Sequence, residues 1–538
     1  MRPFVPLGFL VGTFLAFASA TVPAGHVMVT PLLQAGRAKD VRNLTEISYQ
    51  GTSYGYAGHY TVPAEHNAER DNHIYSWYQP CRDCDDSDDA PVILWLQGGP
   101  GGPGWFGAFA EIGNWYIGGN TTDAEPHPRC FSWCSQNNCL FVDQPVNTGF
   151  SYQTDRNTGK PITDVSQVDY TGTSRSAMTQ VLSVLTQFYQ AFPELADNEF
   201  TITGESYGGL YTANLGYLIM EHNKIAPANK RINFKSLAVG DPCINWKTQM
   251  PTYPDTLYGM GVIMLDERAD LAARFAESLK TIDTDCPTAF HAWNQIWDDN
   301  GGLAPSEGRG LYAKMTGGRN TADVLMGNSP VPFEYMGQFF ARPEAAKAFR
   351  VAGVPKPSDG GQNGLNIYNA FVQTGDWCSN SSWAYAQLLL HSEIDLMIYS
   401  STSDPILGPP TTEAGVYSIL ADAAAADPVK GGMMKSLFQK QKKDIWFVNS
   451  QSDLNPAGYA KCINTGKNGR RFCYTVVRNA GHEMPAYQPR SGYDMVSRFM
   501  ESRPWDKAGE RPVPTCPQCS GVGPFSGSAD PACHVTNL

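Results

Sequence analysis

Charged residues are scarce in this chain, and positively charged ones are the minority. Only 17% of its 538 residues are charged, and 40 Lys and Arg stand against 52 Asp and Glu, for a formal net charge of -12. A chain of that sign repels a phosphate backbone, so we expect no nucleic-acid partner. Hydrophobic residues make up 42% and aromatic residues 12%, which is too apolar for a disordered chain. The composition predicts a globular protein with a large core.

The apolar run near the N-terminus is too short to span a membrane. It covers residues 7–17, whereas a bilayer requires about 20 apolar residues. Arg2 precedes the run and the small residues 18–20 follow it, which is the pattern of a cleaved signal peptide. We therefore expect residues 1–20 to be a signal peptide and the protein to be secreted, with a vacuolar or lysosome-like compartment as the alternative. No stable membrane association is expected.

Cysteines and sequons fit the secretory route. The 13 cysteines of an exported chain are expected to be mostly disulfide-bonded, and their odd number leaves at least one without an intramolecular partner. The Cys81-x-x-Cys84 and Cys516-x-x-Cys519 pairs have the spacing of a zinc knuckle or a redox pair, but an oxidising compartment favours structural disulfides, so we expect no metal. Three sequons are candidate glycosylation sites: Asn43, Asn120 and Asn380.

Short apolar runs alternate with helical patterns through most of the chain. Helical patterns include residues 174–192 and 209–222. The alternation predicts an α/β fold with a central, mostly parallel sheet flanked by helices. Six β-rich runs are predicted to be buried strands: 92–96, 139–142, 200–203, 395–399, 444–448 and 472–477.

One stretch departs from the alternation. Between about 245 and 370, helix-like segments at 265–281 and 342–352 lie among Gly- and Pro-rich loops. We interpret this stretch as a largely helical cap inserted into a catalytic domain of residues 21–505, because insertions at the carboxyl edge of such a sheet commonly cover the site. Residues 506–538 form a predicted Cys-, Pro- and Gly-rich tail.

The sequence Gly204-Glu-Ser206-Tyr-Gly208 matches the G-x-S-x-G motif. A strand pattern precedes it and a helical pattern follows it, as in the nucleophile elbow of a hydrolase. The flanking glycines suit a strained turn that other chain segments approach closely. Ser206 is therefore a candidate nucleophile. The alternative is a glycine-rich turn with an ordinary serine.

A serine nucleophile requires a base, and the base requires an orienting carboxylate. Of the ten histidines, His482 stands out because it lies in a turn directly after the last predicted strand. The Ser, Asp, His order of this elbow class calls for an acid after a strand between 206 and 482. Asp404 and Asp453 both fit, and the pattern alone does not choose between them.

Four blocks give the chain a specific resemblance to serine carboxypeptidases of the carboxypeptidase Y-like family. The resemblance covers roughly residues 45 to 500 and implies an α/β-hydrolase fold. It favours Asp404 over Asp453, because the family's acid lies in a turn that residues 396–404 approximate. The blocks are 95–101 (WLQGGPG), 142–152 (VDQPVNTGFSY), 204–209 (GESYGG) and 479–485 (NAGHEMP).

The resemblance also implies the residues that bind the transition state and the substrate. The backbone N–H groups of Gly99 and Tyr207 correspond to the oxyanion hole. A carboxypeptidase must recognise a free α-carboxylate, and the family does so with an amide and two acids that share a proton. The corresponding carboxylate-binding residues here are Gln97, Gly98, Glu111 and Glu205.

Crowded acids raise one another's pKa, so peptide binding is expected to be strongest at acidic pH. Glu483 follows His482 where relatives often carry Met, at the border of the pocket for the departing C-terminal residue. We expect its carboxylate to favour basic C-terminal residues. The alternative is a Glu483 that points to solvent or is neutralised by a neighbour.

Together these observations predict a secreted serine carboxypeptidase that removes C-terminal amino acids from peptides and proteins at acidic pH, through an acyl-enzyme and without metal or cofactor. An acyltransferase or esterase with the same triad is the alternative enzyme. A catalytically inactive peptide-binding relative is disfavoured by the intact site. The sequence leaves the oligomeric state open.

Overall fold

The computed structural model of the chain describes residues 25–64, 67–118, 124–297, 310–325, 333–354, 362–466, 469–512, 514 and 516. The predicted signal peptide, the Asn120 sequon, Cys519 and most of the predicted tail lie outside the described residues.

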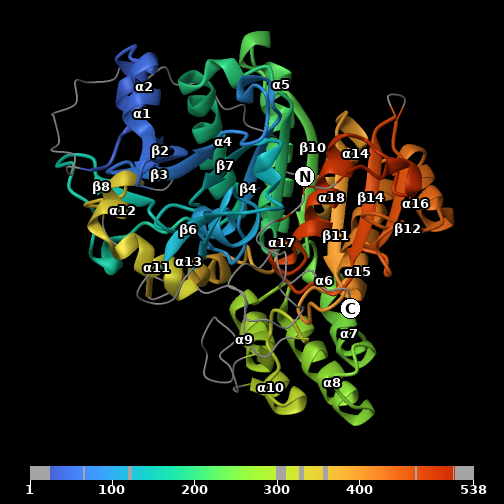
Figure 1. Ribbon diagram of the computed structural model, residues 1–538. Coiled ribbons are helices and arrows are strands. Elements are labelled where there is room, and N and C mark those ends of the chain that lie inside the picture. The colour runs from blue at the N-terminus through green and yellow to red at the C-terminus, as the bar shows by residue number, and fades with distance from the viewer. Residues whose placement is uncertain are drawn as a thin grey trace.

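One sheet of 12 strands organises the described part of the chain (Figure 1). Its centre is parallel, in the order β7 (Asn138–Val142), β4 (Val92–Leu96), β9 (Phe200–Glu205), β10 (Phe234–Gly240), β11 (Asp395–Ser401) and β14 (Arg471–Val477). Antiparallel strands extend both edges: β1 (Glu46–Tyr49), β2 (Thr52–Pro63), β3 (Arg70–Gln79) and β8 (Tyr152–Asp155) beyond β7, and β13 (Gly458–Asn464) and β12 (Asp444–Trp446) beyond β14. A separate hairpin pairs β5 (Trp115–Gly118) with β6 (Glu125–Pro128).

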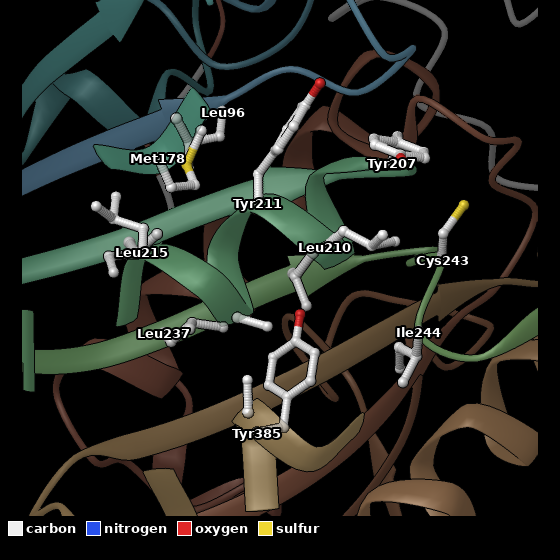
Figure 2. Packing of buried hydrophobic residues seen from close by; sticks show 14 of the residues in the cluster. Leu96, Met178, Tyr207, Leu210, Tyr211, Leu215, Leu237, Cys243, Ile244 and Tyr385 are labelled. Atoms are coloured by element: carbon white, nitrogen blue, oxygen red, sulfur yellow. The ribbon is translucent and has the colours of Figure 1, made fainter. Parts of the chain in front are cut away.

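The central strand β4 is apolar on both faces because each face contributes to a different core. In β4, Leu94 and Leu96 belong to one buried cluster, whereas Ile93 and Trp95 belong to the other, as the two-residue period of a strand requires. The first cluster packs against α4 (Ser174–Ala191), α5 (Gly208–Ile225), α14 (Ser382–His391), α15 (Pro409–Ala426) and α16 (Lys430–Lys440). Figure 2 shows Met178, Leu215 and Leu237 in this cluster. The second packs against α18 (Pro489–Met500), α17 (Met484–Tyr487), α3 (Gly104–Phe106) and the π-helical turn Gly107–Glu111.

The segment predicted as a cap supplies helices and no strand among its described residues. In Figure 1, α7 to α10 project together beyond one edge of the sheet. The predicted helix at 342–352 is shorter, because Arg350 adopts a left-handed φ of 63° that ends helical structure. The helices are α6 (Trp246–Gln249), α7 (Tyr253–Gly259), α8 (Leu265–Thr281), α9 (Cys286–Trp297), α10 (Gly310–Thr316), α11 (Phe333–Ala341), α12 (Pro343–Ala348) and α13 (Gln362–Gln373). At the N-terminal end of the described chain, α1 (Val29–Gln34) and α2 (Ala38–Thr45) precede β1.

The predicted disulfide character of the cysteines is confirmed. Cys81 pairs with Cys84, whereas Cys516 pairs with Cys130 and so ties the start of the predicted tail to the body of the protein. Cys243 is a buried free cysteine. The remaining described bridges are Cys134–Cys139, Cys286–Cys378 and Cys462–Cys473. None of the helices in the described ranges is both long and apolar enough to cross a membrane.

Candidate active site

Ser206 lies in a tight turn between β9 and α5, at the carboxyl edge of the parallel strands. Its φ of 60° is left-handed, a conformation that costs energy for a residue with a side chain and often marks a functional site. A Cβ atom on Gly204 would lie 2.7 Å from the carbonyl oxygen of Leu96, and one on Gly208 would lie 2.8 Å from the same atom. Both positions of the motif therefore require glycine, because β4 passes directly beside the turn.

His482 and Asp404 come from the turns that follow β14 and β11, which are neighbouring parallel strands. The Nδ1 atom of His482 lies 2.7 Å from Oδ2 of Asp404. The other carboxylate oxygen of Asp404 accepts hydrogen bonds from the backbone N–H groups of Ile406, at 2.7 Å, and Leu407, at 3.1 Å. Asp404 is fully buried, so the carboxylate is held in one orientation toward the imidazole.

Asp453, the other acid that the sequence allowed, lies against different groups. Its Oδ2 atom accepts from the backbone N–H of Asn449 at 2.9 Å and from Nη1 of Arg490 at 3.1 Å. The structure thus brings Asp404 to His482 and gives Asp453 a cation and a backbone partner of its own.

The charge environment of His482 is strongly negative. Burial lowers its pKa, but the charges of Asp404, Glu483 and Asp241 outweigh burial and raise the pKa to about 10. Protonating the neighbouring carboxyl groups removes part of that negative charge. The imidazole therefore becomes easier to deprotonate when the acids around it are neutral.

The glycine-rich loop after β4 packs directly on the Ser206 turn. A Cβ atom on Gly98 would lie 2.7 Å from Cβ of Ser206 and 2.9 Å from the backbone nitrogen of Tyr207. The loop is closed by a 2.8 Å hydrogen bond from the N–H of Gly102 to the carbonyl of Gly98, and Gly99 has a φ of 117° that glycine accommodates readily. Gly98 and Tyr207 thus border the serine, and Gly99 follows Gly98 in the loop.

Gln97, Glu111 and Glu205 converge from three separate segments. Trp95 Nε1 donates to Oε1 of Gln97 at 2.7 Å, which orients the amide so that its Nε2 atom lies 3.4 Å from Oε1 of Glu205. Glu111 ends the π-helical turn and is 1% exposed. Among the described residues, neither carboxylate oxygen of Glu111 has a hydrogen-bond partner, nor does Oε2 of Glu205.

Glu111 and Glu205 keep their protons to a higher pH than an ordinary glutamate does. Burial raises the pKa of Glu111 to about 7 and the charge of Glu483 adds to this, although polar interactions with the side chains of Glu205 and Gln97 oppose the shift. Burial also raises the pKa of Glu205 well above its ordinary value, and the negative charges of Glu111 and Glu483 add to the effect. The unsatisfied oxygens and the raised pKa values suit a site that accepts a further polar group.

Glu483 is half-buried beside His482. Its Oε2 atom is buried and has no hydrogen-bond partner among the described residues. Burial raises the pKa of Glu483, although the charge of His482 opposes the shift. Its carboxyl group is therefore only partly solvated.

Two further acids, one fully buried and one half-buried, were missed from the sequence. Asp241 follows β10, and its carboxylate lies in the same cluster as Asp404 and His482. Asp376 accepts a 2.7 Å hydrogen bond from the hydroxyl of Tyr207, and it also bonds Ser174. The signal available for Asp241 was the one used for Asp404, an acid directly after an apolar run, but β10 was not among the predicted strands.

The described sequons are exposed. Asn43 lies in α2, and Asn380 precedes α14. Their glycosylation stays a prediction.

The serine carboxypeptidase family model matches residues 48–502 of the chain. "Probable serine carboxypeptidase CPVL" of Rattus norvegicus is 29% identical over 485 residues, which cover 89% of this chain and 90% of that protein. "Venom serine carboxypeptidase" of Apis mellifera is 27% identical over 485 residues, covering 89% of this chain and 91% of that protein.

A solved structure supports the fold independently. Kex1Δp, a prohormone-processing carboxypeptidase from Saccharomyces cerevisiae, superimposes with a TM-score of 0.61 and 19% sequence identity over 85% of this chain and 93% of its own. The predicted α/β-hydrolase fold is thereby confirmed. Because the family model covers most of its length, the chain belongs to the serine carboxypeptidase family and is a serine-type carboxypeptidase.

Proposed function

We propose that Ser206 is the nucleophile, that His482 is its general base, and that Asp404 orients the imidazole. The observation that carries this proposal is the 2.7 Å contact between His482 Nδ1 and Asp404 Oδ2 at the strand edge that also holds the strained Ser206 turn. With Nδ1 engaged by the acid, Nε2 remains to take the serine proton. Ser206 would attack the last peptide carbonyl to form an acyl-enzyme, which water then hydrolyses.

The oxyanion formed in that attack would be stabilised by the N–H groups of Gly99 and Tyr207. Support comes from the close packing of Gly98 on the Ser206 turn, which leaves no room for a side chain between the two segments. Backbone donors fixed in this way stabilise developing charge without reorganisation.

Recognition of the substrate's free carboxylate would fall to Gln97, Gly98, Glu111 and Glu205. The buried, unpartnered oxygens of the two acids support this assignment, because a carboxyl that holds a proton can donate it to a substrate carboxylate. Peptide hydrolysis would therefore be favoured at acidic pH, where Glu111 and Glu205 are protonated.

Neighbouring acids would also influence the base. The carboxyl groups around His482 raise its pKa while they are charged, so neutralising them lowers the pH above which the imidazole is free to accept a proton. Secretion, or delivery to a vacuolar or lysosome-like compartment, is the cellular route that we propose for a chain with these disulfides.

The test combines active-site labelling with product analysis. The chain should react with a fluorophosphonate and release free amino acids one at a time from peptide C-termini, whereas Ser206→Ala should do neither and still unfold at a similar temperature. Ser206→Ala with near-normal turnover would remove the serine from the mechanism. Ester formation with an added alcohol in preference to amino-acid release would instead identify the acyltransferase.

A further inference from the structure

Asp241 lies at the carboxyl end of β10, between the strand that leads to Ser206 and the strand that leads to Asp404. It is fully buried and has a left-handed φ of 41°. Its backbone N–H donates to the carbonyl of Tyr399 at 2.8 Å. Burying an aspartate in a strained backbone conformation costs free energy, so interactions of its carboxylate must offset that cost.

The Asp241 carboxylate is held firmly by one neighbour. Its Oδ1 atom accepts from the backbone N–H of Ser401 at 2.8 Å, and its Oδ2 atom accepts from the Ser401 hydroxyl at 2.6 Å. These two bonds attach it to the start of the turn that carries Asp404.

The same carboxylate also faces the base. One polar atom each from Asp241, Asp404 and His482 lie within 4.8 Å of one another. The imidazole of His482 is thus within electrostatic reach of two carboxyl groups, of which Asp404 makes the direct hydrogen bond.

It is unfavourable for Asp241 and Asp404 to be charged at the same time. Burial raises the pKa of Asp241 well above its ordinary value and the charge of Asp404 adds to this, while His482 and the Ser401 hydrogen bonds lower it. Other titratable groups that interact with Asp241 are Glu205, Tyr399 and Tyr474. When two carboxyl groups lie this close in a dry site, one keeps a proton while the other is charged.

We propose that Asp241 is a second positioning acid for His482, which takes over from Asp404 when Asp404 carries no charge. In the intact enzyme Asp404 is the charged partner and Asp241 holds the proton. If the charge on Asp404 is removed, the repulsion that adds to the effect of burial on Asp241 disappears, and the pKa of Asp241 falls. Asp241 then ionises, and its charge stabilises the imidazolium that forms as Ser206 gives up its proton. The pair keeps one negative charge beside the base whichever carboxyl holds the proton.

This inference rests on the proposed triad, and its test is a double-mutant cycle. The four proteins to compare are the parent, Asp404→Asn, Asp241→Asn and the double variant. Asparagine is tolerated in a left-handed backbone conformation such as that of position 241. The assay is kcat/KM on a blocked ester across pH, because that substrate has no carboxylate for Glu111 and Glu205 to recognise. Fluorophosphonate labelling and thermal unfolding report whether each variant keeps its site and fold.

We expect Asp241→Asn to cost about tenfold more in the Asp404→Asn background than in the parent. We also expect the residual activity of Asp404→Asn to rise with pH as Asp241 ionises, and this rise to be absent from the double variant. The matched control is Asp453→Asn added to Asp404→Asn, which should cause no further loss.

A second variant covers the case in which Asp241→Asn does not fold. Ser401→Ala keeps the Asp241 carboxylate but removes the hydroxyl donor that holds it, so it should lower the residual activity of Asp404→Asn. Equal fractional losses in both backgrounds, or identical pH dependence of the single Asp404→Asn and double variants, would overturn the inference while leaving the triad intact. Full activity of Asp404→Asn alone would overturn the proposed triad itself, and this inference with it.

Discussion

Nε2 of Gln97 lies 3.4 Å from Oε1 of Glu205, although 108 positions separate the two residues in the chain. Gln97 follows β4, and Glu205 ends β9, the next strand in the sheet. Parallel pairing thus places an amide and a buried acid together at the edge where Ser206 lies. Glu205, one of the proposed carboxylate-binding residues, directly precedes the proposed nucleophile, so substrate binding and chemistry would be coupled through the backbone of residues 204–208.

A comparison of two variants tests which acid belongs to the proposed triad. Asp404→Asn should lower kcat by several orders of magnitude, because the imidazole loses the carboxylate that accepts the hydrogen bond from its Nδ1 atom. Asp453→Asn should change kcat little, since its partners are Arg490 and a backbone N–H. Steady-state kinetics on a blocked ester measures both. A larger loss of kcat in Asp453→Asn than in Asp404→Asn would show that Asp404 is not the triad acid.

Glu111 and Glu205 should control the pH dependence of peptide hydrolysis. The pKa of Glu111 is raised to about 7, so the acid is protonated below that pH and becomes charged as pH rises through it. The charged form repels the substrate carboxylate, and KM for peptides should therefore increase above about pH 7 while KM for blocked esters does not.

The double variant Glu111→Gln, Glu205→Gln should lower kcat/KM for peptides by about tenfold or more, and should affect esters much less. Glu199→Gln is the matched control, because Glu199 is an exposed acid just before β9. Equal losses on peptides and esters would remove the two acids from carboxylate recognition.

Glu483 should influence the residue that is released. Its charge next to His482 should attract a C-terminal Arg side chain, so Glu483→Met should lower the Arg-to-Leu ratio of kcat/KM. A half-buried pair of this kind contributes about 0 to 1 kcal/mol, or up to about fivefold. Because burial raises the pKa of Glu483, the ratio in the parent should begin to fall above the ordinary glutamate value of about 4.3 as pH is lowered. Paired peptides ending in Arg and Leu measure the ratio, and no change in the variant would show that Glu483 does not border the pocket.

Buried histidines far from the triad should limit stability at low pH. Burial lowers the pKa of His73 to about 3 and that of His59 well below its ordinary value. His73 bonds Thr61 at 3.0 Å and Thr154 at 2.9 Å through its two ring nitrogens. Between about pH 6.5 and 3 the unfolded chain binds protons at these histidines that the folded chain does not, so the free energy of unfolding should fall as pH falls, by on the order of 1 to 3 kcal/mol per histidine.

Urea unfolding at pH 7 and pH 4.5 measures this loss. His73→Gln should unfold with a shallower pH dependence than the parent, whereas His291→Gln, at an exposed position, should keep the parent's dependence. A His73→Gln slope equal to the parent's would show that His73 is protonated in the folded protein.

Much of the parallel sheet could be predicted from the sequence, and the polar strands could not. β4 is apolar at every position, and β11 is apolar at 396–399, because both faces of these strands are buried, and that signal is local. β3 carries Asn72, His73 and Gln79 in buried positions, so composition did not identify it. The elbow was predictable because its glycines and serine are adjacent in the chain.

The sequence by itself determined the Ser206 turn, the His482 turn and the α/β alternation, because each depends on residues within one strand or turn. Only the tertiary structure decided that Asp404 meets His482, that Glu111 joins Glu205, and that Asp241 stands beside the pair. These contacts join different strands and turns at the carboxyl edge of one sheet. No local sequence pattern predicts these contacts, because the order of the strands in the sheet, and not their order in the chain, decides which side chains meet.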